Sequence, residues 1–324
     1  MMFWKLRRLS KYSFLILMYH RVIPRTEVKE TVQAGMYVEP NTFARHIKFL
    51  KKFFLVVPIV ELCSLRQRNF VNLSSSPLCV LTFDDGWCDF YKYAFPILKA
   101  HRVPATVFMP TDFIGTKDWF WTDRLALLLR YGDKLKKAEI SPGATNNPIA
   151  NKLFSLKVSR EFRLESAIKL LKTYKNGEIE KVINELSAIW DIGPYPKGRA
   201  FLKWEEVREM ALSGLITFGS HTASHRILTT LEEKDIESEL TKSKDRLIAE
   251  KVVNPLCIPF SYPNGNYNGR IAEMVKEAGY GLAVTTKKGW NHHRSDYYVL
   301  KRMSIHQDMT STDALLGCRI VGTF

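Results

Sequence analysis

Two short stretches, far apart in the sequence, carry the side chains best suited to chemistry. The first ends the apolar run 78–83 with two carboxylates, Asp84 and Asp85. The second holds two imidazoles, His221 and His225, four residues apart. Imidazole nitrogens and carboxylate oxygens are typical zinc ligands, and a catalytic zinc keeps one coordination position for water beside three protein ligands. Together the two stretches indicate a metal-dependent hydrolase.

Both stretches follow segments with the pattern of buried β-strands. Residues 78–83 and 215–218 are short apolar runs that stop at polar residues and glycine, as strands do where a loop begins. Ligands of α/β proteins bind at the carboxyl ends of parallel strands, so we expect both motifs at one edge of a sheet. If the chain turns helical there, His221 and His225 share one face. Taken alone, the Asp-Asp-Gly sequence is also ordinary turn chemistry.

The rest of the chain supplies the elements of an α/β fold. With 324 residues, 46% of them hydrophobic, it can bury a substantial core. Strand-like runs alternate with amphipathic segments, which favours a parallel sheet covered by helices. Gly279 is a natural helix stop after the last of these segments. The segments predicted to be helical are residues 41–54, 204–213, 232–251 and 270–278.

Beyond the two motifs, the sequence resembles the polysaccharide deacetylases, the NodB-like enzymes of carbohydrate esterase family 4. The acidic and histidine stretches are similar to the first two motifs of that family, and residues 260–265 are similar to the third. The flanking segments match as well, so the resemblance covers most of the chain except a central part. The matching segments are residues 16–22, 82–86, 94–99, 103–108, 221–225 and 260–265.

The resemblance implies a fold as well as an activity. We expect an α/β protein with a distorted (β/α) barrel of the NodB-like type, which has fewer than eight strands and a site at their carboxyl ends. Residues 1–324 would form a single catalytic domain. The central segment, at about residues 119–203, is rich in helix formers and is predicted to be a helical insertion.

The resemblance also assigns roles to individual residues. Asp85, His221 and His225 would hold a divalent metal ion, for which zinc is the best candidate. Asp84 would be the general base, and the backbone N–H of Asn264 would stabilise the oxyanion. The substrate would be an N-acetylated glycan or lipid-linked sugar, and the products acetate and a free amine.

Two positions depart from the family pattern. Many members carry an arginine in the third motif that orients the catalytic aspartate, but this chain has Ser261 there. Arg302, after a late strand-like run, is a candidate to supply that charge from another strand end. The late histidine motif that provides the general acid has no clean counterpart, and His306 and His20 are both candidates.

Three other functions remain open at this point. A chain that keeps a glycan-binding groove but has lost a proton-transfer group would be a glycan-binding module without turnover. A deformylase and an esterase acting on O-acylated sugars would need the same metal and the same activated water. The intact pairs of aspartates and histidines favour an enzyme over a binding module.

Charge and cysteine content restrict the partners and the compartment. The formal charge is +15, but Lys and Arg are dispersed and no nucleic-acid-binding signature appears, so we do not expect nucleic acid as a partner. Five cysteines without a Cys-x-x-Cys spacing argue against a disulfide framework and for a reducing compartment. The basic segment 3–12 and the apolar run 14–18 lack the length and cleavage site of a signal peptide. We therefore expect a cytoplasmic protein, with possible peripheral contact to an anionic membrane face.

Overall fold

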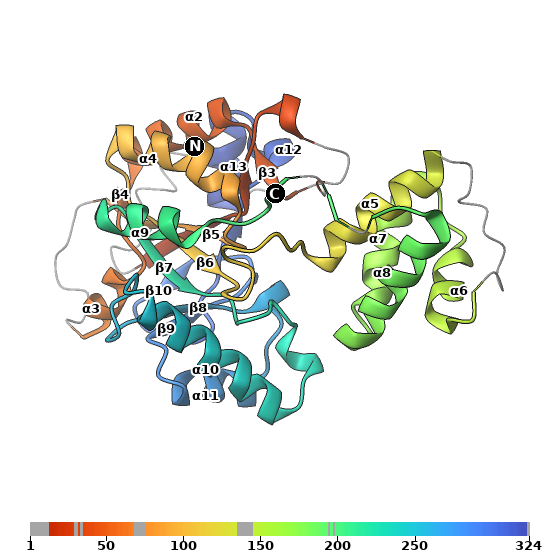
Figure 1. The fold of residues 1–324 in the computed structure, drawn as a ribbon. Coiled ribbons are helices and arrows are strands. Elements are labelled where there is room, and N and C mark those ends of the chain that lie inside the picture. The colour runs from red at the N-terminus through yellow and green to blue at the C-terminus, as the bar shows by residue number, and fades with distance from the viewer. Residues whose placement is uncertain are drawn as a thin grey trace. The chain divides into compact units, whose positions relative to one another are not determined.

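A computed structural model gives the fold. It describes residues 13–28, 32, 35–67, 76–134, 145–193, 195–196 and 198–322, so the basic segment 3–12 lies outside the described residues. The chain divides into two compact units (Figure 1). The first consists of residues 1–27, 34–116 and 201–324, and the second of residues 28–33 and 117–200.

The first unit is built on a nine-stranded sheet in the order β10-β1-β5-β6-β7-β8-β9, with β4 beside β5 and β11 beside β1. All pairings are parallel except that of β10 with β1. Two further short strands, β2 (Arg21–Val22) and β3 (Tyr37–Val38), pair with each other. The strands of the sheet are β1 (Ser13–Tyr19), β4 (Leu55–Val56), β5 (Leu78–Phe83), β6 (Ala105–Met109), β7 (Ile216–Ser220), β8 (Pro259–Ser261), β9 (Leu282–Val284), β10 (Asn291–His292) and β11 (Met303–Ser304).

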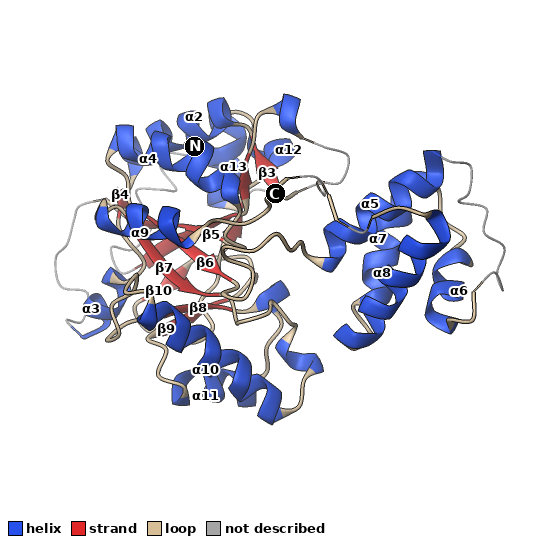
Figure 2. Cartoon of the chain, in the orientation of Figure 1, coloured by secondary structure: helices blue, strands red, loops and turns tan. Residues whose placement is uncertain are grey.

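Helices surround this sheet (Figure 2). Because helices cover its faces, the central strands are largely apolar, and all six residues of β5 are buried. The α-helices of this unit are α2 (Pro40–Phe53), α3 (Glu61–Gln67), α4 (Phe95–His101), α9 (Trp204–Leu212), α10 (Glu233–Ala249), α11 (Gly269–Glu277), α12 (Gln307–Thr310) and α13 (Asp313–Val321). Short 3-10 or π turns occupy Arg25–Glu27, Phe90–Ala94, Leu228–Thr230 and Pro263–Gly265.

One late segment links the two ends of the row of parallel strands. Leu300 forms a parallel bridge with Val284 of β9. Shortly afterwards Met303 and Ser304 pair with β1. The fold is therefore a distorted (β/α) barrel with fewer strands than a complete one, as predicted.

The four helical predictions are confirmed to within about two residues at each end. Residues 41–54, 204–213, 232–251 and 270–278 correspond to α2, α9, α10 and α11. Gly279 has φ +83°, the left-handed conformation that ends a helix and favours glycine. The amphipathic period located these helices because each of them packs one apolar face against the sheet.

The second unit is a helical bundle with its own apolar core. Its helices pack through leucine, isoleucine and alanine side chains and the buried Trp190. Asn147 starts one of them with a side-chain cap that accepts from the N–H groups of Ile149 and Ala150. The helices are α5 (Trp121–Lys134), α6 (Pro148–Phe154), α7 (Arg160–Leu171) and α8 (Asn176–Trp190).

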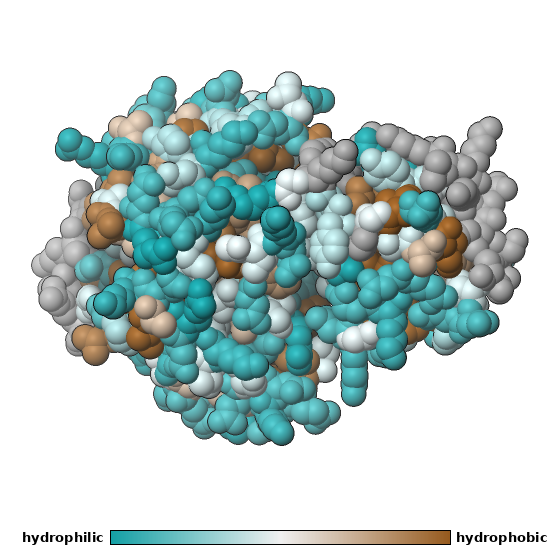
Figure 3. Space-filling view, in the orientation of Figure 1, coloured by the Kyte–Doolittle hydropathy of each residue, from teal (hydrophilic) through white to brown (hydrophobic). Residues whose placement is uncertain are grey.

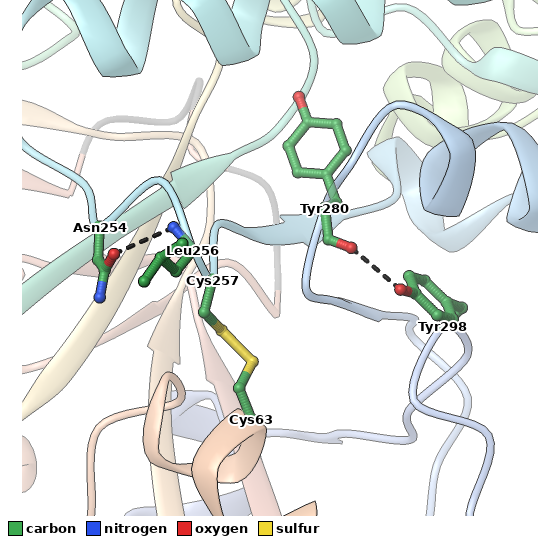
Figure 4. Close-up of a disulfide and its surroundings, with 6 residues drawn as sticks. All are labelled: Cys63, Asn254, Leu256, Cys257, Tyr280 and Tyr298. Atoms are coloured by element: carbon green, nitrogen blue, oxygen red, sulfur yellow. Dashed lines mark hydrogen bonds between the residues drawn. A yellow bond between two sulfur atoms is a disulfide. The ribbon is translucent and has the colours of Figure 1, made fainter. Parts of the chain in front are cut away.

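The expectation that the cysteines form no disulfide framework is wrong for one pair. Cys63 on α3 and Cys257 before β8 form a disulfide across 194 residues of sequence (Figure 4). Gly281 makes room for it, because a Cβ there would lie 2.9 Å from the Cys257 Sγ. Cysteine spacing could not reveal this pair, because the two sulfurs meet only where α3 lies near the segment that precedes β8. Cys79, Cys88 and Cys318 are not part of this disulfide.

The surface in view in Figure 3 is largely hydrophilic, with apolar residues in small separate areas. Among the described residues the most exposed large apolar side chains are Leu212 and Leu256. Within the same residues, no helix has both the length and the apolarity needed to cross a bilayer.

His46, buried on α2, should make the stability of the barrel depend on pH. Its Nδ1 accepts from the Tyr19 hydroxyl (3.2 Å) and its Nε2 donates to the Thr310 carbonyl (2.6 Å). Burial lowers the pKa of His46 to about 4. The unfolded chain therefore binds a proton at higher pH than the folded one, and the free energy of unfolding should fall as pH drops from about 6.5 to about 4.

We expect this single group to remove about 3 kcal/mol over that range, since each unit of pKa shift is worth 1.36 kcal/mol. The measurement is urea unfolding at several pH values. A His46→Gln variant should show a flatter acid limb, and His101→Gln, a partly exposed control, should not. Equal slopes for His46→Gln and the wild type would contradict the assignment.

Candidate functional site

The two motifs meet at the carboxyl edge of the barrel strands. β5 ends at Phe83, and the N–H of Asp84 then donates to the Tyr19 carbonyl at the end of β1 (3.0 Å). β7 ends at Ser220, and the N–H of His221 donates to a carbonyl of β6 (3.0 Å). Neighbouring parallel strands thus deliver residues that lie far apart in the sequence to one place.

Asp85, His221 and His225 form a group suited to a metal ion. Their ligand atoms all lie within 4.8 Å of one another. The Asp85 Oδ1 is 3.6 Å from the His221 Nε2 and 3.3 Å from the His225 Nε2. Asp85 and His221 are buried, whereas 27% of the His225 side chain is exposed. Within the described residues no other group of three such side chains meets this criterion.

The donor chemistry of the group fits a divalent ion. The Nδ1 of His221 donates to the Ser261 carbonyl (2.7 Å), which leaves the Nε2 lone pair directed toward Asp85. In metal sites, a hydrogen bond made by the ring nitrogen that does not bind the metal orients the histidine ligand. Burial lowers the pKa of His221 to about 4, so its ring is neutral near pH 7, as ligation requires.

The backbone at these ligands is unusual. Asp85, Thr222 and His225 all have positive φ (75°, 64° and 59°), which non-glycine residues rarely adopt and which clusters at functional sites. The Thr222 hydroxyl accepts from the His225 N–H (3.0 Å) and stabilises the loop. The histidines therefore lie on a loop and not on a helical turn, because the Ser220 and Thr222 hydroxyls accept hydrogen bonds from backbone N–H groups and define the local conformation.

Gly219 is required just before this loop. A Cβ at Gly219 would lie 2.6 Å from the Pro259 carbonyl oxygen and 2.7 Å from the Phe108 ring. Any side chain would push β7 away from its neighbours. The glycine therefore permits the close strand spacing that places His221 beside Ser261.

Arg302 is paired with Asp84. Two nitrogens of its guanidinium each donate to one oxygen of the carboxylate at 2.7 Å. Arg302 is fully buried and is also fixed by the Thr285 carbonyl (2.8 Å) and the Thr82 hydroxyl (3.2 Å). Burial raises the pKa of Asp84, but the charge and hydrogen bonds of Arg302, together with the neighbouring histidines, outweigh this and hold that pKa below its usual value. Asp84 is therefore an ionised and oriented carboxylate.

Ser261 completes this arrangement at the position where many family members have arginine. Its hydroxyl accepts from Arg302 (3.0 Å) and lies 3.4 Å from Asp84, while its carbonyl orients His221. A small residue here leaves space for the guanidinium of Arg302 to arrive from another part of the barrel.

The remaining candidates lie in different surroundings. His20 directly follows β1. Burial raises the pKa of Asp85, whereas His225 and, to a smaller extent, the charge of His20 lower it, and the net shift is downward. The ring of His306 is hydrogen-bonded to Asp308; in the described part of the chain, no contact joins His306 to Asp84 or Asp85. Asn264 lies in the tight turn after β8, with φ 58°.

Trp87 is a site residue that the sequence did not indicate. Its indole N–H donates to the Asp85 Oδ2 at 2.9 Å. A tryptophan two residues after an aspartate has no sequence signature for such a contact. Only the turn through Asp85 and Gly86, both with positive φ, brings the ring back over the carboxylate.

A distorted (β/α) barrel with paired aspartates and paired histidines at the carboxyl ends of its strands defines a NodB-like deacetylase fold. The chain belongs to the polysaccharide deacetylase family, whose family model matches residues 74–283. It is 23% identical over 300 residues to YxkH of Bacillus subtilis (strain 168), a protein named for this family; the match covers 92% of this chain and 73% of that relative.

Further relatives agree with this assignment. Poly-β-1,6-N-acetyl-D-glucosamine N-deacetylase of Escherichia coli (strain K12) is 26% identical over an alignment of 238 positions, and the match covers 65% of this chain and 25% of that enzyme. The structure of Streptococcus pyogenes deacetylase PplD in complex with acetate matches with a TM-score of 0.61 and 21% identity, covering 94% of this chain and 97% of that one. IcaB from Ammonifex degensii matches with a TM-score of 0.60 and 18% identity, covering 95% and 97%.

Proposed function

We propose that the protein is a metal-dependent deacetylase that removes N-acetyl groups from an amino-sugar glycan or a lipid-linked sugar. One observation carries the proposal. A three-ligand group, Asp85 with His221 and His225, lies beside a carboxylate, Asp84, that Arg302 holds in a fixed orientation. Membership of the polysaccharide deacetylase family supports the reaction class.

The three-ligand group would hold the metal ion. When bound, a divalent ion lowers the pKa of a coordinated water and polarises the acetamide carbonyl. Two neutral imidazoles and one carboxylate suit zinc and leave a position for that water.

The other side chains handle protons and charge. Asp84 takes a proton from the attacking water, and Arg302 keeps this carboxylate ionised and aimed. The backbone N–H of Asn264 donates to the oxyanion. His20, whose charge helps to lower the pKa of both Asp84 and Asp85, gives a proton to the leaving nitrogen. His306 stays the alternative general acid.

The substrate class rests on the relatives. The Escherichia coli relative is named for poly-β-1,6-N-acetyl-D-glucosamine. An N-acetylated glucosamine polymer is therefore the first substrate to test, with lipid-linked amino sugars next. Acetate and a free amine on the sugar are the expected products.

Metal removal should abolish the activity. Because the ion is worth several kcal/mol of transition-state stabilisation, acetate release from β-1,6-linked N-acetylglucosamine oligomers should fall by more than about 100-fold after chelation and return with zinc. A His221→Ala variant should not recover when zinc is added.

Each contrary outcome points elsewhere. Undiminished acetate release by metal-free protein would refute the metal dependence. Release of formate from N-formyl sugars, or of acetate from O-acetyl sugars only, would make the protein a deformylase or an esterase. Glycan binding by the metal-loaded protein without turnover of any acylated sugar would make it a binding module.

A further inference from the structure

The carboxylate of Asp85 has two oxygens with different partners. Its Oδ1 faces the Nε2 atoms of His221 and His225. Its Oδ2 accepts the indole N–H of Trp87 at 2.9 Å, and both residues are buried. A carboxylate held through one oxygen in this way presents its other oxygen to an ion between the histidines.

Trp87 is itself held by two further contacts. Its ring stacks on Phe201, with centroids 5.1 Å apart and planes 19° apart. The guanidinium of Arg21 lies 4.4 Å from the centre of the Trp87 ring, within cation–π range. The backbones of Trp87 and Phe201 also form a bridge. The indole is thus fixed by aromatic packing, by charge and by the main chain.

Arg21 is fixed in turn by Asp89. The Nε of Arg21 donates to the Asp89 Oδ2 at 2.7 Å, and the Val22 N–H donates to the Asp89 Oδ1 at 3.1 Å. Asp89 is buried, and Arg21 is largely so. A buried ion pair with this geometry holds the guanidinium at one place against the ring.

We propose that Trp87 is the positioning residue of the metal site and that Arg21, Asp89 and Phe201 form the support that holds its indole. The proposal rests on the metal site put forward under the proposed function. The indole N–H keeps Asp85 in one rotamer, so that Oδ1 points between the two histidines before any ion arrives. Loss of a partner of this kind typically lowers metal affinity or activity by about 10- to 100-fold.

The test is a Trp87→Phe variant, which keeps an aromatic ring for stacking and removes the N–H donor. Zinc affinity is measured by competition with a chromophoric chelator, and the geometry by the visible absorption of the cobalt-substituted protein. We expect the zinc Kd to rise about 10- to 100-fold and the cobalt spectrum to change. The unfolding temperature is measured in parallel.

Trp290→Phe is the matched control. The indole N–H of Trp290 donates to the Ile320 carbonyl (2.9 Å), and the next residue, Asn291, pairs with Phe14 near the start of β1, away from the carboxyl edge. The same chemical change there should leave zinc affinity unaltered. Arg21→Met should raise the zinc Kd by a smaller factor, and should add little in the Trp87→Phe background.

The outcomes separate this inference from the proposed function. A wild-type protein that binds no zinc would refute the proposed function. A wild-type protein that binds zinc, with Trp87→Phe binding it within twofold, would overturn the role of Trp87 alone. If Trp87→Phe does not fold, Arg21→Met decides, because unchanged zinc affinity and an unchanged cobalt spectrum in that variant would also overturn the inference.

Discussion

Asp84→Asn should reduce acetate release by about 100- to 10,000-fold at equal zinc content, because an amide cannot take the proton of the attacking water. The neighbouring ligand Asp85 keeps its contacts with His225 and Trp87, so zinc binding should persist. The measurement is acetate release under single-turnover conditions, with zinc determined in the same samples.

Stability must be followed in this variant, since the amide also faces the buried guanidinium of Arg302. Ser261→Ala is a useful control, because it removes a hydroxyl that contacts both partners but leaves the carboxylate in place. Its loss of turnover should be much smaller. Turnover of Asp84→Asn within tenfold of the wild type would remove Asp84 from the role of general base.

Arg302→Met should destabilise the barrel by about 3–5 kcal/mol, because it leaves the buried carboxylate of Asp84 without its charged partner. Ser261, at 3.4 Å, is a poor substitute. Turnover should also fall by about 100-fold, since a general base that is free to rotate loses its alignment. Urea unfolding gives the stability change, and acetate release gives the turnover.

Arg270→Met provides the surface comparison. Arg270 also makes two hydrogen bonds to one carboxylate, that of Glu233, at 3.1 Å each, but both side chains are about half exposed. The loss there should stay below about 1 kcal/mol. Arg302→Lys, which keeps the charge but not the paired geometry, should recover part of the stability and less of the turnover. Equal losses in Arg302→Met and Arg270→Met would show that the buried pair is not a structural anchor.

Local sequence pattern was sufficient for most of the secondary structure. The amphipathic period located α2, α9, α10 and α11, and apolar runs located β5 and β7, because in an α/β fold each element buries a face of fixed periodicity. At the histidine loop there is no regular period to read, because side-chain hydrogen bonds and positive φ angles define the backbone there.

The sequence by itself determined the family and the group of residues at the site. Asp84, Asp85, His221 and His225 each follow a strand directly, and a strand end has one place in a parallel sheet, so their meeting followed from topology. Arg302 was the arginine proposed as the partner of Asp84, but only its place after a strand-like run supported that proposal.

Only the tertiary structure decided which distant side chains complete the site. Arg302 reaches Asp84 across 218 residues of sequence, Ser261 orients His221, and the ring of Trp87 returns to Asp85 through a left-handed turn. The disulfide between Cys63 and Cys257 is decided in the same way. Such contacts depend on the paths of loops and the rotamers of long side chains, which no period or spacing in the sequence encodes.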